Sequence, residues 1–233
     1  IAEGINRPDD ALWIAYTVNK EDVWVARLPL PITGTETQRE LQNGFEDFTV
    51  YSPKWAPVTV TGFPSLRLAD FDRYDYAKAE RILCETKRLE LAFTIVPRQA
   101  DHGTLYCELQ DGSGQTAVRL VFREDGMLGL RTTALISLGP YEADREIDIR
   151  ISADCGAYEY TLKIGGGEEK SYRFMTAVKS LSRFVLRTGA PRLVPGREDE
   201  PVEDEGYSLV MADEKEEAAV YDLTRFWAES TEI

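Results

Sequence analysis

Short segments in which apolar and polar residues alternate run through most of this chain, and this two-residue period limits what it can fold into. In the segment RLELAFTIVPRQ, the apolar residues Leu89, Leu91, Phe93 and Ile95 fall on one face. A period of two is that of a β-strand with one buried face. Similar segments, separated by turn sequences, lie at Gly103–Gly126, Arg145–Gly166, Ser182–Gly189 and Ala218–Trp227. They predict an all-β fold, an antiparallel β-sandwich of the jelly-roll type.

Three segments depart from this pattern. Tyr74–Leu83 (YDYAKAERIL) predicts a helix of one to two turns, and the polar segment Ile32–Leu41 is typical of a linker. Gly189–Gly206 is rich in proline and acidic residues. It predicts a long exposed loop, open to proteolysis after Arg192 or Arg197, because it cannot bury enough apolar surface to order itself.

The N-terminal segment ALWIAYTVNKEDVWVARLPLP predicts two short strands joined by the polar turn Asn19–Asp22. A two-stranded hairpin alone is marginally stable in water, so we expect it to pack against a larger object. We accordingly divide the chain into a hairpin at residues 1–31, a linker at 32–43 and a sandwich domain at 44–233. The expected contact surface is the apolar set Leu12, Ile14, Tyr16, Val23 and Val25.

The charge of the chain argues against two classes of partner. Lysine and arginine number 27 against 41 aspartates and glutamates, which gives a net charge of −14. Such a chain repels phosphate backbones and anionic membrane surfaces. No basic patch is evident, because the cations in Lys163–Arg173 and Arg183–Arg197 alternate with Glu, Gly and apolar residues. We therefore expect neither nucleic acid nor a membrane as partner, and no apolar run reaches the ~18–20 residues of a membrane helix.

The three cysteines, Cys84, Cys107 and Cys155, allow at most one disulfide and have no metal-ligand spacing. We expect them to be reduced and mostly buried, since free cysteine behaves as a small apolar residue. Cys155 stands at a predicted turn, so we expect it to react first with a thiol reagent.

Several stretches together resemble a known family. The hairpin LWIAYTVNKEDVWVARLPLPI resembles the end of a six-bladed sialidase-like (BNR-type) β-propeller of secreted bacterial glycan-processing proteins, in which the last blade continues into a concanavalin-like or laminin-G-like sandwich. Four later stretches are similar to that appended sandwich: Trp55–Val60, Leu66–Leu83, Glu108–Phe122 and Arg187–Arg192.

This resemblance implies a module of an extracytoplasmic protein, either secreted or periplasmic. It implies that the hairpin meets an upstream propeller or a second copy of the chain. The active site of that family lies on the propeller face, and the Asp box Ser-x-Asp-x-Gly-x-x-Trp is absent from this sequence. The resemblance therefore assigns no catalytic residue to this chain.

The residues themselves give little sign of catalysis. His102 is the only histidine, and its sequence RQADHGTL is typical of a solvated turn. A glycosidase needs a facing pair of carboxylates. The strands EDFTVYS and EIDIRIS lack the alternating carboxylate pattern that such a pair takes on one strand of a jelly roll.

Two groups of residues are candidates for binding. Asp70, Asp72 and Asp75 offer the hard oxygen ligands that calcium prefers, although they lack the glycine and distal glutamate of an EF-hand loop. Alternatively, they cap the helix expected after them. The four tryptophans could stack on sugar rings or fill the core and domain interfaces: Trp13, Trp24, Trp55 and Trp227.

Three hypotheses follow for function. The first, which we prefer, is a non-catalytic accessory module of a larger glycan-processing protein, without a cofactor other than structural calcium. The second is a carbohydrate-binding module, which exposed aromatic side chains on a sheet face would favour. The third is a small glycosidase or lyase, which a buried carboxylate pair in a groove would favour.

Overall fold

The computed structural model describes residues 11–18, 22–29, 45, 47–53, 55–61, 65–72, 76–189, 193–194, 197–201 and 214–232. The chain divides into two compact units, Ile1–Glu36 and Thr37–Ile233. The expected domain boundaries stay a prediction. The described residues include no helix that is long and apolar enough to cross a membrane.

The first unit contains the expected hairpin. Strand β1 (Ala11–Val18) pairs antiparallel with β2 (Asp22–Pro29), and the register places Tyr16 opposite Trp24. Residues directly opposite share one face of the pair, and successive residues alternate between faces. Because Val23 and Val25 pair with Thr17 and Ala15, they do not belong to the same set of positions as Tyr16. The register therefore divides the predicted apolar set between two sets of positions, and its role as a contact surface stays a prediction.

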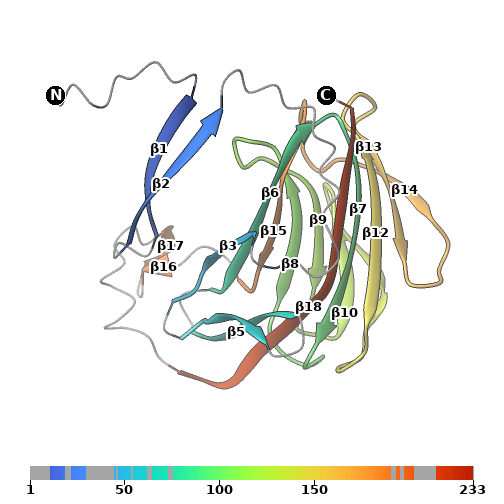
Figure 1. The fold of residues 1–233 in the computed structure, drawn as a ribbon. Helices are drawn as coiled ribbons and strands as arrows, with labels where there is room; N and C mark the ends of the chain where they lie inside the picture. The colour runs from blue at the N-terminus through green and yellow to red at the C-terminus, as the bar shows by residue number, and fades with distance from the viewer. Residues whose placement is uncertain are drawn as a thin grey trace. The chain divides into compact units, whose positions relative to one another are not determined.

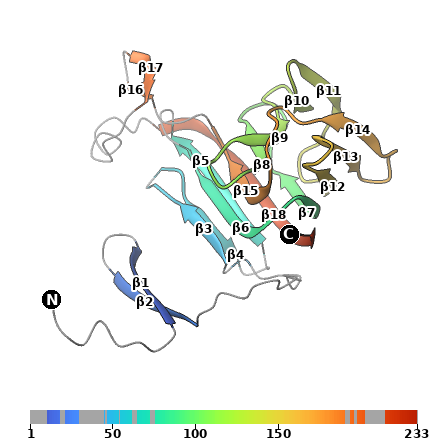
Figure 2. The same cartoon turned by 90° about the horizontal axis from the view of Figure 1, so that it is seen from above.

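The second unit is built from two seven-stranded antiparallel sheets, which confirms the predicted β-sandwich (Figure 1). The first sheet has the order β11 (Leu135–Pro140), β10 (Met127–Arg131), β9 (Thr116–Phe122), β8 (Leu105–Gln110), β15 (Leu181–Arg187), β6 (Lys78–Thr86) and β3 (Phe48–Tyr51). The second has the order β14 (Lys170–Arg173), β13 (Glu159–Ile164), β12 (Ile147–Asp154), β7 (Arg88–Pro97), β18 (Glu214–Glu232), β5 (Ser65–Asp72) and β4 (Val58–Thr61). The neighbouring positions of β8 and β15, and of β12 and β13, can be followed from above in Figure 2.

The two sheets enclose one apolar core, to which the inner strands of both sheets contribute most; the edge strands β11 and β14 contribute no fully buried residue. Phe93 from the second sheet lies 4.9 Å from Phe184 of the first, centroid to centroid. Phe226 contacts both Phe184 and Phe48 at 5.2 Å. Burying a side chain of this size contributes roughly 1.5–3 kcal/mol, so the aromatic contacts hold the two sheets together.

The helix expected at Tyr74–Leu83 is wrong, because β6 occupies its second half. The alanine, lysine and glutamate of this stretch favour a helix when taken alone. In the fold, however, Ala79 and Leu83 are buried in the core at alternating positions, and β6 pairs with β15 and β3. Tertiary pairing therefore overrides local propensity.

The acidic segment is not wholly unstructured, as the sequence had suggested. Two short strands, β16 (Leu193–Val194) and β17 (Arg197–Pro201), pair antiparallel within it. In the sequence they stand on either side of a Pro-Gly dipeptide, which favours turns. The rest of this segment after Gly189, and the expected linker Ile32–Leu41, lie outside the described residues. The expected proteolysis stays a prediction.

Candidate functional site

A β-bulge in β18 decides which of its side chains face outward. The register of β18 against β7 shifts between Leu223 and Arg225. An inserted residue reverses the alternation of faces beyond it. As a result Phe226 enters the core at 4% exposure, and Arg225 and Trp227 lie on the outer face of the second sheet.

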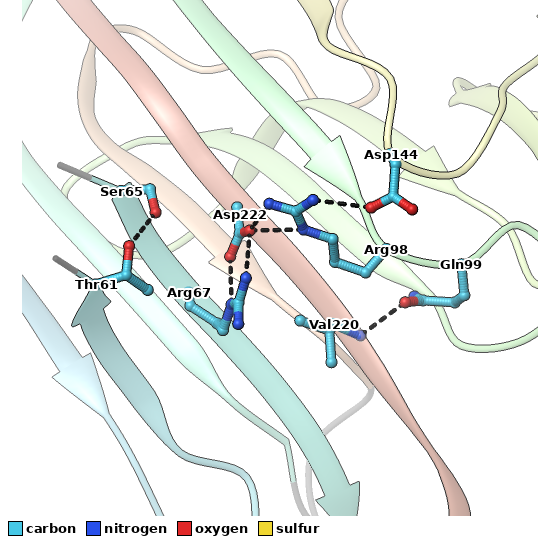
Figure 3. Close-up of polar contacts among 8 residues, drawn as sticks. All are labelled: Thr61, Ser65, Arg67, Arg98, Gln99, Asp144, Val220 and Asp222. Carbon is cyan, nitrogen blue, oxygen red and sulfur yellow. Dashed lines mark hydrogen bonds and ion pairs between the residues drawn. The ribbon is translucent and has the colours of Figure 1, made fainter. Parts of the chain in front are cut away.

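Just before the bulge, β18 is held in register by a buried carboxylate. Asp222 is 1% exposed and accepts hydrogen bonds from two guanidinium groups, Arg67 Nε and Nη2 at 2.7 and 2.8 Å and Arg98 Nε and Nη2 at 2.8 and 2.6 Å. Arg98 also reaches Asp144 at 2.8 Å (Figure 3). Burial disfavours the charged form, but the hydrogen bonds from the two arginines outweigh it and lower the pKa of Asp222.

Beside Trp227 the outer face of the second sheet is hollowed. One row across four strands consists of Trp227 of β18, Ala92 of β7, Arg150 of β12 and Lys163 of β13. These four residues are among those that line a hollow of about 300 Å³. The short side chain of Ala92, between the indole and the guanidinium, leaves the space in which a ligand would lie. We call this the Trp227 hollow.

The next row supplies polar groups to the same hollow. Thr94 donates its hydroxyl to Asp148 Oδ1 at 2.6 Å. Arg225 Nη2 bonds Glu146 Oε2 at 2.5 Å and lies 3.5 Å from Asp148 Oδ1. The hollow therefore offers one aromatic face with both hydrogen-bond donors and acceptors around it.

The hollow continues into a larger groove. This groove has a volume of about 860 Å³ and is lined by residues of both sheets near their edge strands β11 and β14. It shares Asp148 and Gly165 with the Trp227 hollow. Its apolar lining includes Leu138, Ile147, Ile164 and Tyr172, and its charged lining includes Glu142, Arg145, Glu168 and Lys170. We call it the edge groove; its size is that of ligand sites in proteins, about 300–1,000 Å³.

The structure gives less information about the other three tryptophans. The side chains of Trp13 and Trp24 lie outside the described residues, and Trp55 is half-buried next to β4. Of the two tryptophans whose side chains are described, Trp227 lines a hollow with polar groups. Sequence reasoning named it but gave no ground for choosing it, because the bulge that turns it outward has no clear signal in the sequence.

His102 lies at a turn, as expected. Its Nδ1 is 2.7 Å from the carboxylate of Asp101, and its Nε2 is 3.1 Å from the backbone carbonyl of Ala218. Both ring nitrogens thus have a structural partner. The contact with Ala218 ties the turn to β18, and the hydrogen bonds of the imidazole to described residues include none to a serine or cysteine.

The sheet register also brings together two carboxylates that are 139 residues apart in the sequence. Glu229 of β18 stands directly opposite Glu90 of β7, and Ser152 donates to Glu90 at 2.5 Å. Glu90 is exposed and Glu229 half-exposed. A glycosidase of the jelly-roll type would hold its facing carboxylates in a groove. This pair lies on the outer face of the second sheet.

The candidate calcium ligands lie in and beside β5. Asp70 and Asp72 are 1% and 2% exposed, and Asp70 Oδ1 accepts a hydrogen bond from the backbone N–H of Asp72 at 2.9 Å. Strand β6 follows, so the alternative role of capping a helix is wrong. Asp75 lies outside the described residues, and the described part of the chain contains no cluster of three or more metal-ligating side chains. Calcium binding stays a prediction.

The described cysteines are free thiols, but their order of exposure differs from the prediction. Cys155 is 3% exposed and belongs to the core, although its backbone lies just after β12. Burial raises its pKa to about 11. Cys84 is half-exposed, because β6 lies one strand from the edge of its sheet. The expectation that Cys155 is the least covered is therefore wrong.

Cations that are distant in the sequence gather on the outer face of the first sheet. Arg119 of β9 stands directly opposite Arg131 of β10, and Arg187 of β15 is paired with Tyr106 of β8. A hollow of about 400 Å³ is lined by Arg119, Arg131 and Arg123. The strand register thus brings together arginines that are distant in the sequence, with Glu124 and Asp125 in the same lining. The expected absence of nucleic-acid and membrane partners stays a prediction.

Comparison with known families agrees with this architecture. Residues 48–203 match the family described as "Sialidase-like, CBM domain". This match spans more than half of the chain, so the chain belongs to the sialidase-like carbohydrate-binding-module family. The class of protein is therefore an accessory or carbohydrate-binding β-sandwich domain.

Solved structures agree on the fold. A sialidase is similar with a TM-score of 0.72 and 28% identity over 98% of this chain, which spans 22% of the length of that sialidase. An endo-acting O-glycanase of the human gut microbiota has a TM-score of 0.54 at 8% identity, with 79% of this chain and 92% of that chain covered. A β-glucanase of Bacillus licheniformis has a TM-score of 0.50 at 9% identity, with the same coverage. A comparison with curated proteins finds no match.

Proposed function

We propose that this chain is the carbohydrate-binding module of a larger glycan-processing protein, and that the Trp227 hollow and the edge groove hold the glycan. The observation that carries the proposal is the row Trp227, Ala92, Arg150 and Lys163, in which an aromatic face borders a hollow lined by donors. The family match supports a carbohydrate-binding class. It raises this reading above the purely structural module that the sequence favoured.

The chemistry of the lining fits a sugar chain. Sugar rings present C–H faces that pack on an aromatic face and hydroxyl groups that both donate and accept hydrogen bonds. Trp227 provides the first contact, and Asp148 with Arg150 provides an acceptor and a donor beside it. The edge groove continues from Asp148 with apolar and charged residues of both signs, so the two together accommodate several sugar units.

The test is glycan binding by the Trp227→Ala variant. We expect the full chain to be retained on a glycan array or in affinity electrophoresis with soluble polysaccharides. The variant loses the indole face, and we expect its affinity to fall at least about tenfold, equivalent to 1.4 kcal/mol. Phe71→Ala is the matched control, since Phe71 is an exposed aromatic residue (37%) on β5 of the same sheet.

The outcomes separate the hypotheses. Equal glycan affinity of Trp227→Ala and the wild type would show that the glycan does not bind in the Trp227 hollow. No retention of the wild type on any glycan would overturn the binding function and leave the accessory role. Thermal unfolding of both variants must match that of the wild type, so that a loss of binding reports on the site.

We also propose an accessory role beside a β-propeller, through the N-terminal hairpin. The similarity to the sialidase supports it, because that match covers 98% of this chain but only 22% of the sialidase. Biolayer interferometry of the chain with a purified sialidase-like propeller tests this contact. Light scattering over a range of concentrations tests the other expected partner, a second copy of the chain. A chain that stays monomeric and does not bind the propeller would contradict both expected contacts.

The location that we propose is extracytoplasmic, as expected for a module that meets glycans outside the cell. Fractionation of the source cells with an antibody against the chain tests it. Recovery of the protein only with cytoplasmic markers would contradict the proposal.

A further inference from the structure

A second hollow lies on the outer face of the first sheet, away from Trp227. We call it the arginine hollow; its volume is about 400 Å³ and its lining includes Tyr106, Arg119, Arg123 and Arg131. Arg119 and Arg131 are directly opposite each other on β9 and β10. Side chains so placed are close neighbours, and like charges in this position destabilise a sheet.

A buried carboxylate beneath the hollow fixes one of these arginines. Glu108 is 1% exposed and accepts a hydrogen bond from Arg119 Nε at 2.5 Å, from Arg187 Nη2 at 3.0 Å and from Gln110 Nε2 at 2.8 Å. Arg119 makes this contact through Nε, and its two terminal nitrogens have no hydrogen bond to another described residue. The guanidinium is thus held in one orientation by Glu108.

An aromatic ring supports the same arrangement. The guanidinium carbon of Arg187 lies 4.3 Å from the ring centroid of Tyr106, and that of Arg119 lies 5.7 Å from it. Cation–π contacts of this kind restrict the planes of both arginines. Tyr106 also lines the hollow, so it offers a ligand an apolar edge beside the cations.

The charge around the hollow is unusual for this chain. Arg123 is paired with Asp125 at 2.5 Å, and Glu124 is the other acidic residue in the lining. Among the described residues Arg131 has no carboxylate within 4.0 Å, and it is exposed. The lining therefore has three arginines against two carboxylates, an excess of one positive charge in a protein whose net charge is −14.

We infer that the arginine hollow binds a single sugar unit that carries one anionic group, a carboxylate or a sulfate ester. The anion lies between Arg119 and Arg131, because guanidinium groups bind such oxygens by paired, charge-assisted hydrogen bonds. It relieves the repulsion between the two arginines. The overall negative charge repels long polyanions, so the ligand is a terminal or isolated acidic sugar. This inference does not depend on the Trp227 hollow.

The experiment compares methyl β-D-glucuronide with methyl β-D-glucoside, which differ in one carboxylate. Binding to the full chain is followed by ligand-observed NMR or calorimetry, with glucose 6-sulfate as the sulfate probe. We expect the neutral glycoside to bind at least tenfold more weakly than one of the two anionic probes, and the anionic sugar to bind more weakly as salt is raised. The anionic probe that binds more tightly shows whether the site prefers a carboxylate or a sulfate ester.

Three variants locate the site. Arg131→Gln changes an exposed residue and should weaken the anionic sugar at least tenfold with no change in thermal unfolding. Arg119→Gln should do the same, although it also removes a partner of Glu108. Arg173→Gln, 88% exposed on β14, is the matched control and should bind as the wild type.

Two results would overturn the inference. The first is equal binding of all three probes, or no binding of either anionic one. The second is anionic binding that survives Arg131→Gln but is lost in Trp227→Ala, which would place the anion in the other hollow. Failure of neutral glycans to bind, with anionic binding intact, would refute the proposed function alone.

Discussion

The substitution Asp222→Asn tests how the second sheet is held in register. Asp222 is 1% exposed, and its two oxygens accept hydrogen bonds from Arg67 and Arg98 (Figure 3). Asparagine has nearly the same shape, but it carries no charge and replaces one acceptor oxygen with a donor nitrogen. That nitrogen faces a guanidinium group in either orientation: at the position of Oδ1 it loses the hydrogen bond from Arg67, and at the position of Oδ2 it loses those from both arginines.

The magnitude follows from the exposure of the partners. Removing one member of a fully buried ion pair costs about 3–5 kcal/mol. Arg67 and Arg98 keep side-chain exposures of 39%, so water compensates part of their loss. We expect a cost of about 2–3 kcal/mol. For a chain of this length each kcal/mol lowers Tm by roughly 2–4 °C, so Tm should fall by about 4–12 °C.

The dependence on pH adds a second signature. The pKa of Asp222 is lowered in the folded state, so its ionised form contributes stability that is complete above its unfolded pKa of about 3.9. That contribution is lost as the pH falls from there through the folded pKa. The difference in unfolding free energy between wild type and Asp222→Asn should thus be constant near neutral pH and shrink below about pH 4.

Urea unfolding followed by fluorescence, from pH 3 to pH 7, measures both quantities. The control is Glu159→Gln, because Glu159 forms a long, exposed ion pair with Arg173 at 3.7 Å. Its cost should be within about 0.5 kcal/mol. Wild-type stability of Asp222→Asn at pH 7 would refute the role of the buried carboxylate. A deficit that does not change down to pH 3 would refute its electrostatic origin.

Further predictions concern thiols, glycines and calcium. A thiol reagent should label Cys84 first in native protein, and Cys107 and Cys155 only on unfolding, because burial raises the pKa of both thiols; rapid labelling of Cys155 would be the contrary result. Gly103→Ala should be much more destabilising than Gly114→Ala. Both glycines have positive φ (72° and 87°), but an added Cβ at Gly103 meets Ala219 Cβ at 2.3 Å and at Gly114 meets nothing within 4 Å. Similar Tm values for these two variants would contradict the close packing. If the aspartates of β5 bind calcium, millimolar CaCl₂ should raise Tm and an equal concentration of MgCl₂ should not. An unchanged Tm with both salts would contradict calcium binding.

The sandwich was predictable because its strands bury one face. The alternation of Leu89, Leu91 and Phe93 corresponds to three core residues of β7 at 1–2% exposure. This alternation is a local feature of the sequence, so it predicts a strand even when the order of the strands is unknown. It failed at β6, where alanine and charged residues favour a helix, and pairing with β15 and β3 decides otherwise. Such a pairing is not visible in the stretch itself.

The candidate sites were much less predictable, because they are assembled across strands. Ala92 and Trp227 meet although 135 residues separate them, and Arg119 meets Arg131 only through the register of β9 and β10. A search for charges close together in the sequence cannot find such sites. Arg131 lies in β10, which was not among the predicted strands, so the second site had no signal in the sequence.

The bulge in β18 connects stability to function in one strand. On its N-terminal side Asp222 fixes the register against β5 and β7; on its C-terminal side Phe226 fills the core and Trp227 faces outward. If Thr224 were paired in the ladder like its neighbours, with no bulge, the alternation would continue unbroken through it and exchange the two aromatic side chains. The core would then receive the indole, and the outer face would lose its aromatic residue beside Ala92. The same insertion that gives the sandwich its aromatic core therefore creates the surface on which we propose that a glycan binds.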